Sequence, residues 1–239
     1  MINLIYIIYS IIGWIVCALA FSCHMALVLL VSPFLKDQVE FNIASTRPII
    51  RFSFWILGIR LIVEGAENIP EDRSFIVVAN HQSHVDIPAF LLAIRRPFGF
   101  VAKKELLNVP IVGWDIRSQG HIAIDRKNPA QSRHQLQSLV TDISTNKKNL
   151  VIFAEGTRSA TGKLGKFKLG AFDLAAKSGT VIVPASITGS YNVLNKKSMV
   201  MKPGTIRIRI HPVVPPPSAE AGGLESARER VAAIIQADI

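Results

Sequence analysis

The sequence predicts an α/β domain, with a mainly parallel or mixed sheet flanked by helices, that follows N-terminal membrane-associating helices. Short apolar runs typical of strands alternate with longer segments of helical periodicity, which is the pattern of an α/β domain. Residues 2–35 contain no Asp, Glu, Lys or Arg. We therefore expect a membrane-anchoring helical segment at residues 1–58 and the α/β domain at residues 59–239.

The composition narrows the class of protein and of partner. The chain has 239 residues, 49% of them hydrophobic and 18% charged, which is too apolar for a disordered protein. A net charge of +10 suits nucleic acid, an anionic membrane surface or an anionic substrate. The apolar N-terminus favours the membrane, and the absence of nucleic-acid-binding modules argues against nucleic acid. Cys17 and Cys23 both lie in the apolar run, so no disulfide framework or metal site follows from them.

The N-terminal run is long enough for a membrane helix, which needs about 20 apolar residues. A cleaved signal peptide is the alternative, since Ala18-Leu19-Ala20 resembles a cleavage site. The missing basic n-region and the continuation of the run to Leu35 favour the anchor. The basic residues that follow, beginning with Lys36, predict that the rest of the protein faces the cytoplasm.

Residues 47–60 combine arginines with aromatic and aliphatic side chains, among them Arg47, Arg51, Phe52 and Trp55. This mixture is typical of an amphipathic helix at a membrane interface. An ordinary helix packed on the domain is the alternative.

Hydrophobic periodicity and the residues that begin or interrupt helices and strands predict the elements of the domain. Ile59, Leu61 and Val63 alternate with charged residues and predict an edge strand, whereas the uninterrupted apolar run 75–79 predicts a buried strand. Asn128-Pro129 predicts the start of a helix with core residues Leu136, Leu139, Val140 and Ile143. The other predicted helices are 86–94, 110–118, 168–177 and 225–237, and the other strands are 98–102, 121–125, 150–154, 180–185 and 206–210, with a Pro-rich linker at 212–217.

A first polar cluster, residues 80–86, directly follows a predicted buried strand. His81 and Asp86 are five residues apart and meet if a tight turn leads into a helix. The carboxylate then orients the imidazole, and the neutral imidazole can take a proton from a hydroxyl. The alternative is that Asp86 only caps its helix and His81 is a polar loop residue.

Two further clusters also follow strands. In the sequence from Glu155 to Ser159, Gly156 lets the backbone approach a ligand and Arg158 offers a planar fork to a phosphate. A solvated basic loop is the alternative. The third cluster ends in Asp125-Arg126, which can also be a structural ion pair. Ligands of such sheets bind beyond the carboxyl ends of the strands, where all three clusters fall.

Together these clusters resemble the glycerolipid acyltransferase family, specifically its 1-acylglycerol-3-phosphate (lysophosphatidic acid) O-acyltransferases. Four segments match the family's motifs in order: 80–86 with the His-four-residues-Asp motif, 120–126 with the second, 153–159 with the third, and 183–185 with the Val-Pro element. Residues 103–106 and 168–172 also resemble family segments. The N-terminal run is similar to the membrane-associating helices of bacterial members, which implies the inner (cytoplasmic) membrane.

The resemblance implies transfer of an acyl chain from acyl-CoA or acyl-carrier protein to the sn-2 hydroxyl of 1-acylglycerol 3-phosphate, giving phosphatidic acid in phospholipid biosynthesis. His81 would be the general base, Asp86 would orient it, and no acyl-enzyme, cofactor or metal would be needed. Arg158, Arg126 and a lysine of the Lys103-Lys104 pair would hold the acceptor phosphate. The implied substrate-binding set is Arg158, Arg126, Lys103, Lys104, Glu155, Gly156, Thr157 and, as a weaker candidate, Lys168.

Other readings stay open at this point. The acceptor could be glycerol 3-phosphate, a lyso-ornithine lipid or another lysophospholipid, since the motifs do not specify the head group. His81, His84 and Asp86 could instead form a metal-dependent phosphoester hydrolase, and Ser83 is a weaker candidate nucleophile. A non-catalytic module that only docks on anionic lipid is the third alternative.

Overall fold

The structure is a computed structural model that describes residues 4–109, 112–125, 129–218 and 220–239. In this part of the chain seven strands form a single sheet in the order β1-β7-β6-β2-β5-β3-β4. The strands are β1 (Ile59–Glu64), β2 (Phe75–Ala79), β3 (Gly99–Lys103), β4 (Ile122–Ile124), β5 (Leu150–Phe153), β6 (Val181–Thr188) and β7 (Gly204–Ile210). The described α-helices are α1 (Leu4–Val31), α2 (Gln38–Ile56), α3 (Asp86–Ala93), α4 (Val112–Ser118), α5 (Pro129–Asn146), α6 (Gly170–Ser178), α7 (Ser190–Val193) and α8 (Gly223–Gln236).

The predicted fold class is confirmed. Neighbouring strands pair in parallel except β6 and β7, which are antiparallel, so the sheet is mainly parallel but mixed. The predicted edge strand β1 does lie at one edge of the sheet. The predicted buried strand β2 lies between β5 and β6 with every residue buried.

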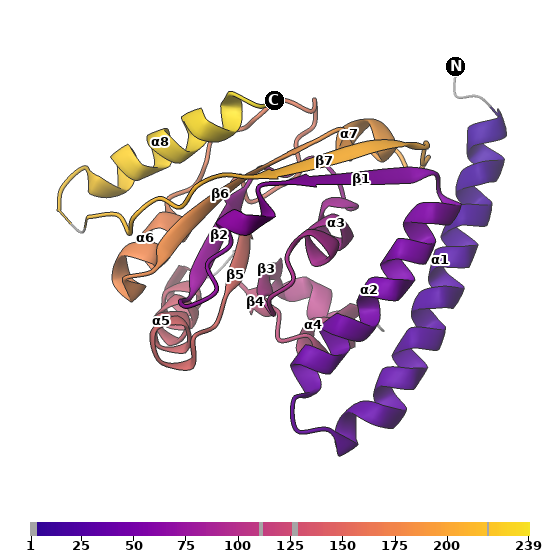
Figure 1. Ribbon diagram of the computed structural model, residues 1–239, viewed down its shortest axis with the longest axis horizontal. Coiled ribbons are helices and arrows are strands. Elements are labelled where there is room, and N and C mark those ends of the chain that lie inside the picture. Colours follow the sequence, from indigo (N-terminus) through magenta and orange to yellow (C-terminus); the bar gives the residue numbers. More distant parts are fainter. Residues whose placement is uncertain (1–3, 110–111, 126–128, 219) are drawn as a thin grey trace.

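Helices cover both faces of the sheet (Figure 1). The alternation of side chains along β2 shows why. Phe75, Val77 and Ala79 belong to a hydrophobic core that includes α2 and α3. Ile76 and Val78 belong to a second core that includes α5, α6 and α8. A strand presents successive side chains to opposite faces, so an all-apolar strand requires a helical layer on each side.

The two N-terminal helices lie side by side and antiparallel at one flank of the domain (Figure 1). Helix α1 is long and apolar enough to cross a membrane, by length and composition. It nevertheless bonds to the rest of the fold: the Tyr9 hydroxyl donates to the Leu57 carbonyl, and the Trp14 ring N–H donates to the Met199 carbonyl (2.9 Å). The division into an anchoring segment and a domain at residue 58 stays a prediction.

The predicted bounds of the helix at residues 47–60 were wrong. The helix is α2, which begins nine residues earlier and ends at Ile56. Arg47 does not face outward, because its guanidinium donates to the carbonyls of Leu91 (3.0 Å) and Ile94 (2.9 Å) at the end of α3. A cation at a helix C-terminus is favourable, so Arg47 docks α2 onto the domain.

The outer face of α2 keeps the predicted character. Arg51, Phe52, Trp55 and Ile56 are exposed, with Trp55 at 76%. The helix is therefore packed on the domain along one face and aromatic and basic along the other.

Other predicted elements differ in smaller ways. Helix α6 begins at Gly170, so Lys168 precedes the helix rather than starting it. Strand β6 continues to Thr188, because its last four residues pair with β7. Leu139 and Ile143 are buried and Val140 packs against the same core. Residues 110–111, Asn128 and the side chain of Leu136 lie outside the described part.

Candidate active site

The polar clusters at residues 80–86 and 155–159 meet because the strands before them are neighbours. β2 and β5 are paired in parallel with Ala79 opposite Phe153, so the two chains leave the sheet side by side. The Ala154 N–H also donates to the Ala79 carbonyl (3.1 Å), which continues the pairing by one step. The site thus lies at the carboxyl edge of the sheet, as such sites do in open α/β folds.

His81 and Asp86 form a hydrogen-bonded pair. The His81 Nδ1 lies 2.7 Å from the Asp86 Oδ2. The same carboxylate oxygen accepts the backbone N–H groups of Gln82 (2.7 Å) and Ser83 (2.8 Å), and the Asp86 side chain is fully buried. A carboxylate fixed by backbone donors at the first turn of α3 cannot move away from the imidazole.

This pairing leaves the other ring nitrogen available. Because an ionised carboxylate only accepts, Nδ1 carries the proton and Nε2 keeps its lone pair. Among the described residues no group forms a hydrogen bond with Nε2, and the His81 side chain retains 13% exposure. His81 can therefore accept a proton from a hydroxyl that approaches this edge.

An aromatic stack fixes the plane of the imidazole. The His81 ring stacks on the Phe153 ring with centroids 4.0 Å apart and planes 11° from parallel. Phe153 in turn stacks on Phe100 (5.8 Å) and meets the edge of Phe90 (5.7 Å). Such pairs add to the apolar contact, so the ring is held both by its face and by its Nδ1.

Glu155 joins three segments of the site. Its carboxylate accepts the His81 N–H (2.9 Å) through one oxygen and the Gly165 N–H (3.0 Å) through the other. Burial raises the pKa of Glu155 above its ordinary value, and the two backbone N–H donors oppose that rise. The Ser159 N–H also donates to the His81 carbonyl (2.7 Å). Glu155 therefore holds the 80–86 and 155–159 clusters together.

A glycine is required at position 156, in the 155–159 cluster, for a structural reason. Gly156 has φ +70°, in the left-handed region, and a Cβ there would lie 2.8 Å from the Lys168 Nζ. The Lys168 side chain thus lies directly against the Gly156 backbone. The structure brings Lys168, although it precedes α6 by two residues, to the 155–159 cluster.

Arg158 carries its charge toward the catalytic loop. The pKa of His84 is lowered, first by burial and then by the positive charge of Arg158. Thr157 is exposed beside it, and its hydroxyl accepts a bond from Lys196 (3.0 Å). The charge of Arg158 therefore acts on the loop that carries His81.

Lys103 and Lys104, two further predicted phosphate ligands, lie at the β3–β4 end of the sheet. Lys103 pairs with Glu105 (3.3 Å), and Lys104 pairs with Asp125 (3.5 Å) at the end of β4. Arg126 lies outside the described residues. The assignment of Lys103, Lys104 and Arg126 to the phosphate stays a prediction.

The structure weakens two alternatives. The Ser83 hydroxyl is fully buried and donates to the Leu194 carbonyl (2.5 Å), so it is not presented to a substrate as a nucleophile. In the described part of the chain no three His, Cys, Asp or Glu side chains gather as metal ligands. The expected metal-free chemistry itself stays a prediction.

An apolar cavity of about 430 Å³ opens beside the catalytic loop. His84, three residues after His81, lines it together with side chains of α1, α2 and α3 such as Trp14, Ile50 and Leu91. Along α2 the lining residues run from Thr46 to Phe54, so the cavity follows that helix for about 12 Å at 1.5 Å per residue. A cavity of this length and polarity suits an alkyl chain.

The far part of this cavity is polar. Asp115 and Gln119 of the α4 region line it near Thr46, and the Gln119 amide donates to the Asp115 carboxylate. Burial raises the pKa of Asp115 to about 6, although the bond from Gln119 opposes the rise. A buried carboxyl at this place limits how far an apolar chain can extend.

Sequence reasoning missed the cavity and the residues that line it. Trp14, Ile50 and Leu91 carry ordinary helical periodicity, which does not separate a core position from one that faces a cavity. It also missed Lys196, which lies in a segment without a motif. Only the packing of distant segments reveals either of them.

Comparison with known proteins decides the family. The model of the Acyltransferase family matches residues 60–188, which is more than half of the chain. This chain belongs to the acyltransferase family. The matched residues contain all three polar clusters and the Val-Pro element, so the predicted family is confirmed.

Relatives in this family agree with the resemblance. The chain is 34% identical over 184 residues to a 1-acyl-sn-glycerol-3-phosphate acyltransferase of Chlamydomonas reinhardtii, covering 75% of this chain and 54% of the relative. It is 36% identical over 169 residues to the Pseudomonas aeruginosa enzyme of that name, covering 69% of this chain and 64% of the relative. The chain thus spans about half the length of the first of these relatives.

The same family supplies a solved structure with this fold. The crystal structure of the 1-acyl-sn-glycerophosphate (LPA) acyltransferase PlsC from Thermotoga maritima superposes with a TM-score of 0.84 at 28% identity. The superposition covers 99% of this chain and 97% of that one, so the N-terminal helices are included.

Proposed function

We propose that this acyltransferase esterifies the sn-2 hydroxyl of 1-acylglycerol 3-phosphate and so makes phosphatidic acid for phospholipid biosynthesis. The observation that carries the proposal is the His81–Asp86 pair, with its free Nε2, next to both an arginine and an apolar cavity. A lysophospholipid has the matching chemistry: a hydroxyl, a phosphate and an acyl chain. The names of the protein's relatives point to the same reaction.

The geometry supports direct acyl transfer. The His81 Nε2 takes the proton of the acceptor hydroxyl while the hydroxyl oxygen attacks the thioester carbonyl carbon. The carbon–sulfur bond then breaks, and the imidazolium returns its proton to the leaving thiolate. Asp86 stabilises the imidazolium between these steps, since its carboxylate lies 2.7 Å from Nδ1. The donor, acyl-CoA or acyl-carrier protein, already carries an activated acyl group, so the proposed reaction uses no cofactor.

Arg158 is the proposed ligand of the acceptor phosphate. Its charge reaches His84 in the catalytic loop, and guanidinium binds phosphate through paired donors. Arg158→Ala should raise the acceptor KM with a smaller effect on turnover. If the KM for the acceptor did not change, the phosphate would have to bind elsewhere.

The reaction is tested by acyl transfer from radiolabelled acyl-CoA and acyl-carrier protein to 1-acylglycerol 3-phosphate, with wild type beside His81→Ala. Phosphatidic acid made only by wild type supports both the reaction and the base. Product from glycerol 3-phosphate or a lyso-ornithine lipid, but not from 1-acylglycerol 3-phosphate, overturns the acceptor while keeping the chemistry. If no acceptor gives an acyl-transfer product, and if the protein instead hydrolyses a phosphoester and a chelator abolishes that hydrolysis, the metal-dependent hydrolase is favoured.

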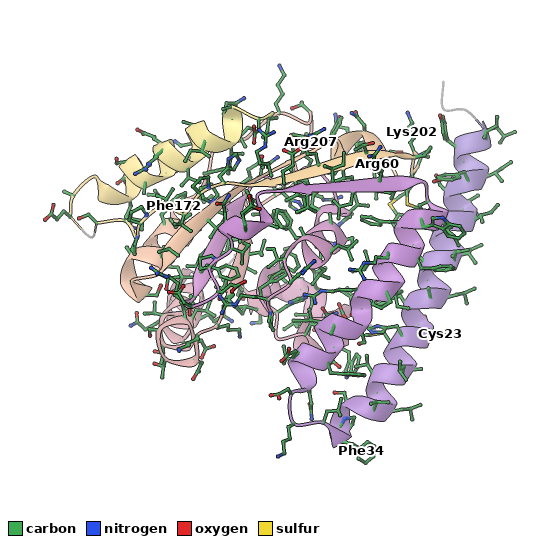
Figure 2. All side chains as sticks on the ribbon, in the orientation of Figure 1. Cys23, Phe34, Arg60, Phe172, Lys202 and Arg207 are labelled. Atoms are coloured by element: carbon green, nitrogen blue, oxygen red, sulfur yellow. The ribbon has the colours of Figure 1, made fainter. Side chains whose placement is uncertain are left out.

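We propose that the protein is bound to the inner membrane with its catalytic site facing the cytoplasm, and that α1 lies within one leaflet. Apolar side chains are exposed along all of α1, from Ile5 (69%) to Leu30 (72%). Figure 2 labels Phe34, 87% exposed, at the turn after α1, and Lys202 near the other end of this helix. Exposed Lys36 lies at the same turn. Charges near both ends of α1 favour a helix that runs along the interface rather than across the bilayer.

Labelling from one side of the membrane tests this arrangement. Tyr6→Cys and Lys36→Cys, each in a background without Cys17 and Cys23, are treated with an impermeant maleimide in oriented vesicles. Both sites should react from the cytoplasmic side only. Reaction from opposite sides would show that α1 spans the membrane.

A further inference from the structure

One segment without a family motif connects three functional parts of the molecule. This connecting segment comprises residues 190–202, that is α7 and the loop before β7. On the catalytic side, its Ser190 hydroxyl contacts the Gln82 side-chain oxygen (3.4 Å), and its Leu194 carbonyl accepts the Ser83 hydroxyl. The connecting segment is therefore bonded to the loop between His81 and Asp86.

The connecting segment is also bonded to the membrane-associating helix. The Ser10 hydroxyl of α1 accepts the Met201 N–H (2.8 Å), and the Trp14 ring donates to the Met199 carbonyl (2.9 Å). The Lys202 Nζ lies 5.5 Å from the centroid of the Tyr6 ring, a cation–π distance. These contacts hold the segment on α1 at the end that Lys202 marks in Figure 2.

A third set of contacts reaches the loop that carries Arg158. The Lys196 Nζ donates to the Thr157 hydroxyl (3.0 Å) and to the Arg158 carbonyl (3.2 Å). The Tyr191 hydroxyl donates to the Ala160 carbonyl (3.2 Å). Residues 157 and 160 of this loop are exposed, so its outer side has few packing contacts of its own.

The bonds between the Arg158 loop and His81 hold only the inner side of that loop. There, the Ser159 N–H donates to the His81 carbonyl, and Glu155 is clamped by backbone donors. Gly156, between Glu155 and Arg158, has a left-handed backbone conformation. As a glycine it has no side chain that could pack. A charged donor on the Arg158 carbonyl fixes the residue from its other side.

We propose that Lys196 is a positioning residue for acceptor binding: it holds the backbone of Thr157 and Arg158 so that the Arg158 guanidinium meets the acceptor phosphate. This inference rests on the proposed function. Lys196 acts through Arg158 and not on the reacting atoms. Its effect belongs to the binding of the phosphate-bearing acceptor and not to proton transfer or to the thioester donor.

The neighbouring Lys197 provides a matched control. It has the same charge and is exposed like Lys196, and in the described structure no hydrogen bond or ion pair of its side chain reaches the Arg158 loop. Lys197→Ala removes one positive charge from the same surface without removing the two bonds. Lys196→Arg keeps a charged donor of similar reach.

The kinetic test compares Lys196→Ala, Lys196→Arg and Lys197→Ala with wild type. Lys196→Ala should raise the acceptor KM about 3- to 10-fold, the loss expected for one or two partly exposed charged hydrogen bonds. Turnover and the donor KM should change by less than about twofold. Lys196→Arg should recover most of the loss, and Lys197→Ala should resemble wild type. An equal effect of Lys197→Ala, or a rise in the donor KM instead, would overturn the proposal.

Hydrogen exchange tests the positioning without any turnover. The amides of residues 156–160 should exchange faster in Lys196→Ala than in Lys197→Ala or wild type. Unchanged exchange in Lys196→Ala would contradict the proposal even if the enzyme were active. An inactive wild type with faster exchange in Lys196→Ala would instead contradict the proposed function and leave the contact intact.

Discussion

Two histidine–aspartate pairs of this protein have similar burial but different surroundings. His81 and Asp86 lie 2.7 Å apart with side-chain exposures of 13% and 0%, and His211 and Asp238 lie 3.1 Å apart with exposures of 12% and 15%. The first pair follows β2 at the carboxyl edge of the sheet. The second joins the end of β7 to the residues just after α8.

The pairs differ in which ring nitrogen binds the carboxylate. Asp86 uses Nδ1 of His81, so Nε2 stays open to a ligand. Asp238 uses Nε2 of His211, and the Ser186 hydroxyl contacts the same nitrogen (3.2 Å). Ser186, His211 and Asp238 thus have the residue types of a catalytic triad. They lack its geometry, in which the serine and the aspartate contact different ring nitrogens, because here both contact Nε2.

Their carboxylates also differ in what holds them. Asp86 is the first residue of α3 and accepts two backbone N–H groups besides the imidazole. Asp238 follows the carboxyl end of α8, where an anion is not favoured by the helix dipole, and is held by Arg209 and the Ser186 hydroxyl (2.7 Å). The comparison teaches that residue types alone do not make an acid–base site. A ring nitrogen that stays open to a ligand is also needed.

The largest expected difference between the pairs is in catalysis. His81→Ala should lower kcat/KM for acyl transfer by about 10²–10⁴-fold, because the proposed general base is lost. His211→Ala, assayed on folded protein, should stay within about threefold of wild type, because it lies outside the site. Equal losses for the two variants would break the comparison.

Replacing Asp86 tests the effect of its charge on His81 separately from the packing of its side chain. Asp86→Asn removes the charge that stabilises the imidazolium and that fixes the proton on Nδ1, so acyl transfer should fall by about 10²-fold. Secondary structure from circular dichroism provides the control that the variant is folded. A fully active Asp86→Asn enzyme would mean that His81 does not become charged during the reaction.

The corresponding change at the other pair should affect stability and not activity. Asp238→Asn weakens the bonds to Arg209, His211 and Ser186, and should lower the free energy of unfolding by roughly 1–2 kcal/mol. Denaturant unfolding in detergent measures this loss, with acyl transfer at low denaturant as the comparison. A loss of activity without a loss of stability would contradict the structural role.

The smallest expected effect is a pH dependence of stability at His211. Burial lowers the pKa of His211, and the charge of Asp238 opposes this shift. A histidine with a lowered pKa contributes stability that is present above its unfolded pKa, near 6.5, and is lost as the pH falls through the folded pKa. The stability advantage of wild type over His211→Asn should therefore shrink between pH 7.5 and pH 5. A growing advantage over that range would show that the charge of Asp238 outweighs burial.

Several predicted features did not need the structure, because they depend on local order along the chain. An all-apolar run such as 75–79 must lie between two layers, and polar residues directly after it must lie at the carboxyl edge. The five-residue spacing of His81 and Asp86 is spanned by one turn at the start of α3. For the same reason the order of motifs predicted the family, which the comparisons confirmed.

The sequence by itself determined the α/β class, the apolar N-terminal helix and the identities of the residues that form the His81–Asp86 pair. Tertiary structure decided that Arg47 faces the domain, that four helices enclose a cavity beside His84, and that Lys196 reaches the Arg158 carbonyl. The physical reason is the range of the interactions. Periodicity and capping act within a few residues, whereas a cavity or a supporting bond joins segments that only the packing of the whole chain brings together.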